Sequence, residues 1–269
     1  MRGLAKTFGS VAAALLVATT GWGGWAADDA EPGAIETIVL SNAEHTLWHE
    51  VAHLLVSELE LPVVGQEEDA ADGFATLMML GDEDATDIER LLDVAELWIV
   101  SHEVDEAEGL APVYYDEHDL DAQRGLRVVC YVAGAGPGRA HELAADWGLP
   151  EDRAESCEED FELALTSWEA ILDPHFRDGG RGATIRVRYA EEPGPWGELL
   201  RQSEILEAVA EEVADTYVLA PGLTIEAARC DEPNAFWDPG LRTVTLCYEI
   251  LEDFADLARI ALSTREGGS

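Results

Sequence analysis

Apolar side chains recur every three or four residues along most of the chain, the pattern of helices that bury one face. The first clear example covers residues 44–60, where five apolar residues share a face before Pro62 and Gly65 end the pattern. The same spacing predicts further helices over residues 67–80, 86–102, 117–132, 151–172, 197–218 and 248–263.

Strand patterns are fewer and lie mainly in the C-terminal part. Apolar and polar residues alternate over 183–190, 222–228 and 241–247, which predicts three antiparallel strands, and the apolar run over 35–40 predicts a short strand before the first helix. Together these patterns predict a single α+β domain over residues 27–269, mainly helical, with a small antiparallel sheet in its C-terminal part.

The charge balance is strongly acidic. The chain has 16 Lys and Arg residues against 56 Asp and Glu residues, a formal charge of −40, and 47% of its residues are hydrophobic. That hydrophobic fraction indicates a folded core beneath an anionic surface rather than a disordered acidic tail. Such a surface repels a polyanion, so we exclude nucleic acid as a partner and expect clefts to favour basic or neutral ligands.

Residues 1–26 have the composition of a secretory signal peptide. Arg2 and Lys6 give a basic start, the apolar run VAAALLVA follows, and residues 24–26 (GWA) fit a cleavage site. An uncleaved membrane anchor is the alternative, but the apolar run is shorter than the roughly 20 residues of a spanning helix. We expect a secreted or periplasmic protein with no stable membrane insertion after cleavage.

Four cysteines in a chain sent to an oxidising compartment predict two disulfides. We favour Cys130–Cys157 and Cys230–Cys247 because each pair brackets a turn-rich segment. A cysteine-ligated metal is the competing interpretation, but the sequence has no CxxC spacing to support it.

The most specific chemical pattern is an HExxH motif on the first predicted helix. His49 and His53 lie four residues apart, so both imidazoles leave one helix face and can bind a single Zn²⁺. Glu50 lies beside them, where it can take a proton from a water molecule at the metal. In a chain this rich in Glu the motif alone is only suggestive, and its place on an amphipathic helix strengthens it.

A third ligand is expected from the acids at the start of the next helix, residues 67–72. Glu68 and Asp72 are four residues apart and share a face. Glu68 can therefore ligate the metal while Asp72 accepts a hydrogen bond from the outer N–H of a ligand histidine. Glu67 and Asp69 are interpreted as acids that complement the helix dipole. Periodicity alone does not decide between Glu67 and Glu68, and the position of Asp72 favours Glu68.

A hydrolase of this kind also needs a donor for the oxyanion that forms during the reaction. The candidates are His118, Tyr114, Tyr115 and Arg124, with His118 our choice for a catalytic role. For Arg124 an ion pair with Asp121, three residues earlier, is the favoured interpretation. His45, one turn before His49, is expected to be exposed rather than a further ligand.

The segment HEVAHLLVSELELPVVGQEEDAADGFA, residues 49–75, resembles a secreted bacterial metallopeptidase family that is itself named from HExxH followed by GxEEDxAD. Its ExxAD is also similar to that of the gluzincin class, and the likeness continues over residues 114–124 and 230–249. The resemblance implies a zincin-like fold with His49, His53 and Glu68 as zinc ligands and Glu50 as base. It supports the metal site better than any particular substrate.

The sequence therefore predicts a zinc metallopeptidase that hydrolyses peptides or proteins with Glu50 as general base. Two other classes stay open. A non-catalytic acidic metal-binding protein gives no reason for Glu50 between the histidines, and a zinc hydrolase of a non-peptide amide or ester would use the same residues. Neither the cleavage specificity nor the oligomeric state follows from the sequence.

Overall fold

The computed structural model describes residues 32–81, 85–136, 140–179, 182–191 and 193–267. The predicted signal peptide, residues 1–26, lies outside them. The helices are α1 (Pro32–Leu59), α2 (Glu67–Leu80), α3 (Ala85–Glu108), α4 (Asp121–Ala135), α5 (Ala140–Asp146), α6 (Glu151–Ala154), α7 (Cys157–Leu172), α8 (Gly194–Ser203), α9 (Ile205–Thr216) and α10 (Tyr248–Gly267), with a 3₁₀ turn over Asp173–His175. The strands are β1 (Arg186–Tyr189), β2 (Thr224–Ala228), β3 (Ala235–Asp238) and β4 (Thr243–Cys247).

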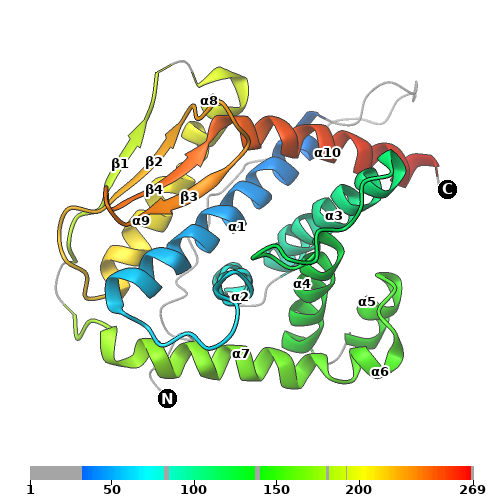
Figure 1. Cartoon of the computed structure of the whole chain (residues 1–269), viewed down its shortest axis with the longest axis horizontal. Helices are drawn as coiled ribbons and strands as arrows, with labels where there is room; N and C mark the ends of the chain where they lie inside the picture. Colours follow the sequence, from blue (N-terminus) through cyan, green and yellow to red (C-terminus); the bar gives the residue numbers. More distant parts are fainter. Residues whose placement is uncertain (1–31, 82–84, 137–139, 180–181, 192, 268–269) are drawn as a thin grey trace, which may run out of the picture.

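Helix α1 is the central element of the fold. Figure 1 shows it crossing the middle of the molecule, with the sheet on one side and α3 and α4 on the other. It contacts α2, α3, α10, β3 and β4, and Val39, Leu47, Val51 and Leu55 on it are fully buried. A helix covered on most sides must be apolar on most sides, which explains why the apolar run over residues 35–40 lies within α1. The side chains of the HExxH motif on α1 are therefore held by a packed core.

The run over 35–40, predicted to be a strand, is part of α1. A short apolar run suits a buried helix as well as a buried strand, and here burial on several sides decides. The polar residues that follow are accommodated inside the helix, because the Ser41 hydroxyl and the Asn42 amide donate to the carbonyls of Thr37 (3.0 Å) and Ile38 (2.9 Å), one turn earlier.

The α+β class, mainly helical with a small C-terminal sheet, is confirmed, but the predicted antiparallel pairing is wrong for both pairs that the three predicted strands form. The strand order is β1-β2-β4-β3, with β1–β2 and β2–β4 parallel and only β3–β4 antiparallel. Alternation reports which face a strand buries and not its direction. Helices α8 and α9 form the crossover that a parallel β1–β2 pair requires. Strand β3, which lies in the turn-rich segment between Cys230 and Cys247 and was not predicted to be a strand, forms the edge next to β4.

Several helix boundaries also differ from the prediction. Helix α4 begins at Asp121, four residues later than expected, and the helix over 151–172 is divided into α6 and α7. The helix over 197–218 is divided into α8 and α9 by Glu204, whose φ of 56° is left-handed and interrupts the helical hydrogen bonds.

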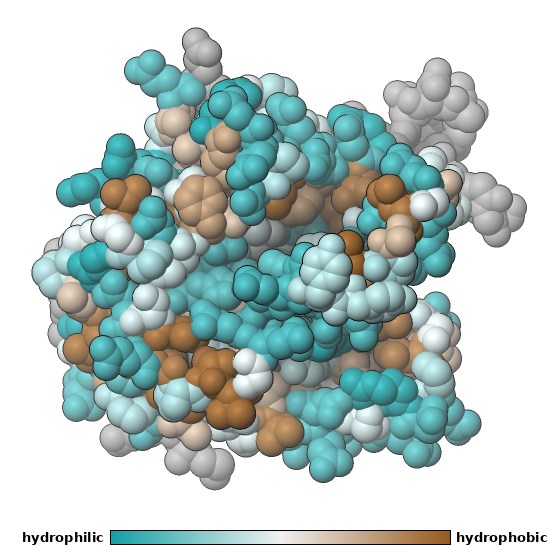
Figure 2. Space-filling model, viewed as in Figure 1, coloured by the Kyte–Doolittle hydropathy of each residue, from teal (hydrophilic) through white to brown (hydrophobic). Residues whose placement is uncertain are grey.

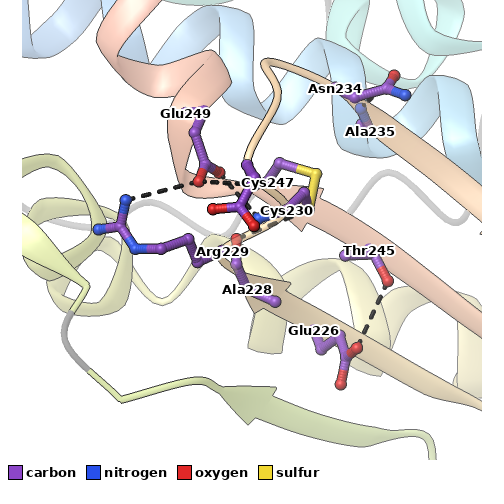
Figure 3. The surroundings of a disulfide bond; sticks show 10 residues. Glu226, Ala228, Arg229, Cys230, Asn234, Ala235, Thr245, Cys247 and Glu249 are labelled. Carbon is purple, nitrogen blue, oxygen red and sulfur yellow. Dashed lines mark hydrogen bonds and ion pairs between the residues drawn. A yellow bond between two sulfur atoms is a disulfide. The ribbon is translucent and has the colours of Figure 1, made fainter.

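Both predicted cysteine pairs are at disulfide distance. Cys130 on α4 is joined to Cys157 on α7, with Cα atoms 5.0 Å apart, and Cys230 is joined to Cys247 at the end of β4, with Cα atoms 5.5 Å apart. Figure 3 shows that the second bond ties the chain between β2 and β3 to the base of α10, where Glu249 accepts the backbone N–H of Cys230 at 3.1 Å. The hairpin that contains β3 is thus fixed at both ends.

Within the described ranges, no helix combines the length and apolarity needed to cross a bilayer.

Candidate metal centre

The site is built across the antiparallel pair α1 and α2. His45 faces Thr76, His49 faces Asp72, and His53 faces Glu67 and Glu68. Each step of four residues forward along α1 matches a step of about four residues backward along α2, as expected for two helices packed side by side. The short connection over residues 60–66 fixes this register, so the HExxH motif meets the acids of the next helix.

One carboxylate oxygen is the centre of the cluster. Glu68 Oε2 lies 3.0 Å from His49 Nε2, 3.2 Å from His53 Nε2 and 2.9 Å from His118 Nε2. The two α1 nitrogens are 3.1 Å apart. His49, Glu68 and His118 also offer ligand atoms that all lie within 4.8 Å of one another. Two overlapping sets of three donors, which share His49 and Glu68, could therefore hold a metal ion.

The donor atoms fit a small cation. Zinc bonds of about 2.0–2.2 Å place tetrahedral ligand atoms about 3.3–3.6 Å apart, close to the 3.0–3.2 Å separations among His49, His53 and Glu68. Two imidazole nitrogens and one carboxylate oxygen that face one another also have more lone pairs than protons can satisfy. A cation at their centre would satisfy all three at once.

The outer nitrogens of both α1 histidines are held by carboxylates. His49 Nδ1 lies 2.8 Å from Asp72 Oδ1, and His53 Nδ1 lies 2.8 Å from Glu67 Oε1. In a neutral ring each carboxylate accepts a hydrogen bond from Nδ1–H, and the Nε2 lone pair then faces the cluster, which is the tautomer that a metal ligand needs. The expected contact between Asp72 and the outer nitrogen of a histidine is therefore present. The contact of Glu67 was missed, because the sequence analysis assigned this residue only to the helix dipole.

The electrostatic field of the cluster favours positive charge. Burial lowers the pKa of His49, but its hydrogen bonds with Asp72 and Glu68 outweigh that effect and raise the pKa to about 9. Burial raises the pKa of Glu68, but hydrogen bonds from His118, His49 and His53 hold it far below its usual range. Glu68 and Asp72 stay ionised in this cluster, and their negative charge attracts either a proton or a metal ion.

Glu50 lies next to the cluster on α1 and is only 7% exposed. Burial raises the pKa of its carboxyl, while His49, His53 and a hydrogen bond from the backbone N–H of Trp237 oppose the rise. That N–H belongs to the edge strand β3, so the sheet holds Glu50 in place. A buried carboxylate with a raised pKa beside a cation site is suited to accept and return a proton.

These groups open into a pocket of about 640 Å³. The histidines and Glu50 lie at its base, and residues of β3 and the turn after it, from Asn234 to Pro239, form one wall. Hydrophilic side chains gather in a recess near the middle of this face in Figure 2, where α1, α2 and the segment between α3 and α4 meet. A second pocket of about 270 Å³ shares His118 and Arg124 with the first.

Of the candidate oxyanion donors, His118 reaches the cluster and the two tyrosines do not. His118, on the segment between α3 and α4, reaches the cluster and is also 3.2 Å from Asp116. Tyr114 and Tyr115 are 82% and 91% exposed and do not line either described pocket.

Two further expectations are wrong. Arg124 binds Asp72, with Nε 2.7 Å from Oδ2, and not Asp121, which instead accepts a hydrogen bond from Ser101 at 2.7 Å. His45 is buried, at 3% exposure, and not exposed, because α2 covers it with Thr76. Both contacts join residues more than 30 positions apart, so helical spacing within one segment gives no sign of them.

The fold and the site together define a mainly helical α+β protein with a cluster of histidines and carboxylates that could hold a metal ion. The chain matches the family described as "Putative metallopeptidase" over residues 24–172 and 190–266, which is most of its length, and it belongs to that family. Membership indicates a metal-dependent peptidase role. No curated protein matches the chain, and no solved structure does.

Proposed function

We propose that the protein is a secreted zinc-dependent peptidase, with His49, His53 and Glu68 as ligands and Glu50 as general base. The observation that carries the proposal is the triangle of His49 Nε2, His53 Nε2 and Glu68 Oε2, with sides of 3.0–3.2 Å, at the base of an open pocket. Three protein ligands with a side open to the pocket is the arrangement typical of a catalytic zinc site.

A bound zinc ion would act as a Lewis acid on the scissile carbonyl and make a nearby water more acidic. The remaining chemistry belongs to the chain. Glu50 accepts a proton from the attacking water and returns it to the leaving amine, aided by its raised pKa. When Glu68 binds the ion, His118 exchanges its Nε2 contact with Glu68 for a hydrogen bond to the developing oxyanion. The pKa of His118 is raised, mainly by its hydrogen bond with Glu68, which favours the protonated donor.

His53 is preferred to His118 as the third ligand for two reasons. It leaves the same buried helix face as His49, and its outer nitrogen is held by Glu67 at 2.8 Å. His118 lies on the segment between two helices, with 41% of its side chain exposed. We expect His53→Ala to abolish zinc binding after dialysis and His118→Ala to retain about one zinc per chain while losing turnover. The reverse result would exchange the two roles.

The decisive experiment for the peptidase activity compares the purified mature protein with Glu50→Gln on a mixture of unmodified peptides. Glutamine keeps the shape of the side chain and leaves the ligands in place, but it cannot take a proton. We expect equal zinc content and a loss of hydrolysis of about 100-fold or more. Turnover by Glu50→Gln at the wild-type rate would refute the mechanism.

The same mixture discriminates the other two classes. A non-peptide amide or ester hydrolase would cleave small esters or amides and leave every peptide intact, and a metal-binding protein without activity would cleave neither. The acidic surface favours basic and neutral peptides over acidic ones. The two disulfides are consistent with an extracellular location.

A further inference from the structure

Arg124, on the first turn of α4, lines the pocket and also makes strong contacts with two neighbouring side chains. Its Nε lies 2.7 Å from Asp72 Oδ2 and its Nη2 lies 2.8 Å from Asp72 Oδ1, a two-pronged ion pair. The guanidinium carbon lies 3.7 Å from the centre of the Trp98 ring. Only 11% of the Arg124 side chain is exposed. The guanidinium charge is therefore paired with Asp72, although the residue lines both pockets.

Asp72 connects this arginine to the metal cluster. The Asp72 side chain is 7% exposed. The same Oδ1 that binds Arg124 also accepts a hydrogen bond from His49 Nδ1, and the two atoms are 2.8 Å apart. An ionised carboxylate buried to this degree is costly unless charged groups surround it. Without Arg124, the Asp72 carboxylate would lose both hydrogen bonds from the guanidinium and would be free to turn toward water. That change removes the acceptor that fixes the tautomer and orientation of His49.

The close approach of α4 to α3 makes this contact possible, and it depends on Gly125. A Cβ at Gly125 would lie 2.8 Å from the carbonyl oxygen of Ala95 and 3.2 Å from Trp98 Cβ. Because no side chain intervenes, α4 packs directly on α3, and the next residue toward the N-terminus, Arg124, lies against the Trp98 ring. The arginine is therefore held on one face by a ring and on its edge by a carboxylate.

We propose that Arg124 is a positioning residue that acts through Asp72: it holds the carboxylate in place, so that His49 presents its Nε2 lone pair to the metal. The inference rests on the proposed function, because it concerns the same centre. It replaces the interpretation of Arg124 as an oxyanion donor, and it assigns Trp98 and Gly125 to the support of the metal ligand.

Arg127, one turn further along α4, provides a matched control. It also joins α4 to α2, through ion pairs with Asp69 at 2.9 Å and with Asp119 on the adjoining segment. Among the described residues, neither of these carboxylates is hydrogen-bonded or ion-paired to a ligand histidine, so Arg127→Met removes a similar tie without affecting His49.

The test measures the zinc dissociation constant by competition with a chromophoric chelator, for the wild type, Arg124→Met, Arg127→Met, Asp72→Asn and the Asp72→Asn/Arg124→Met double variant. We expect Arg124→Met to weaken zinc binding about 10–100-fold, as loss of an outer contact to a ligand typically does, and Arg127→Met to change it by less than about threefold. The double variant should bind zinc about as well as Asp72→Asn alone, because both changes break one chain of contacts.

The visible spectrum of the cobalt-loaded proteins gives a second readout, which should shift in Arg124→Met and stay unchanged in Arg127→Met. Arg124→Lys keeps the charge but loses the fork and the ring contact, so an intermediate affinity supports the proposal and carries the test if Arg124→Met does not fold. Wild-type affinity in Arg124→Met, or fully additive losses in the double variant, would overturn it. Absence of zinc binding by the wild type itself would instead refute the proposed function.

Discussion

Burial of His45 makes the stability of the fold depend on pH in a predictable way. Burial lowers the pKa of this histidine to about 4, with smaller contributions from His49 and Arg124, and Asp72 partly opposes them. The Thr76 hydroxyl donates to the carbonyl of Asp72 at 2.9 Å, so the His45 Nε2, 3.2 Å from that hydroxyl oxygen, must carry the proton of a neutral ring. The folded protein therefore holds His45 uncharged.

The sign and size of the effect follow from linkage. An unfolded histidine takes up a proton near pH 6.5, and the folded one does so only near pH 4, so the unfolded chain binds more protons between these values. Stability is complete above about pH 6.5, falls by about 1.4 kcal/mol per unit below it, and levels off below about pH 4. Between about pH 7.5 and pH 5 this one residue should cost about 2 kcal/mol.

Urea unfolding of the wild type and of His45→Gln, with a chelator in both samples, isolates this contribution. Glutamine keeps an N–H donor for Thr76 but has no proton to gain, and the other titrating groups are common to both proteins. We expect the wild type to lose about 2 kcal/mol more than His45→Gln between about pH 7.5 and pH 5. Parallel pH profiles for the two proteins, or a His45 resonance that titrates near its ordinary pKa, would refute the reasoning.

Three other changes test different parts of the molecule. Replacing Cys230 and Cys247 by serine should lower the free energy of unfolding by about 3 kcal/mol in chemical denaturation, the value expected for a closed loop of this length, and an unchanged midpoint would contradict the tether. Gly134→Ala should cost about 2–3 kcal/mol in the same assay, because its Cβ would lie 2.2 Å from a backbone carbonyl oxygen of α7, and a neutral effect would mean that the two helices separate freely. In zinc titrations, Glu68→Gln should weaken binding far more than Glu67→Gln, since only Glu68 lies at the centre of the cluster, and the reverse order would move the ligand by one position.

The convergence of His49, His53, Glu68 and Asp72 was largely predictable because it depends on short-range spacing. Helical periodicity places His49 and His53 on one face, and the four-residue interval between Glu68 and Asp72 repeats it on the next helix. A short connection then leaves few ways to pack the two helices other than antiparallel. The ionisation of these groups and the pairing of Glu67 with His53 depend on side-chain directions that the pattern does not contain.

Contacts between distant segments explain most of the errors. Arg124 has Asp121 one turn away, and only the packing of α4 against α2 brings Asp72 nearer, 52 residues back in the chain. Strand directions failed for a related reason, since alternation is the same in parallel and antiparallel pairs. Strand β3 was missed because Asp238, Pro239 and Gly240 favour a turn, and four residues beside a turn are too few to show a period.

The bond between Cys230 and Cys247 has a consequence for where the pocket can be complete. Strand β3 has four residues and a single neighbouring strand, yet it forms a wall of the pocket and donates the Trp237 N–H to Glu50. The histidines and Glu68 stand on α1 and α2 and have no such tether. In a reducing environment the Cys230–Cys247 bond would be lost, and with it the anchor of the wall that holds Glu50. Completion of the pocket is thereby coupled to thiol oxidation, which an oxidising compartment supports.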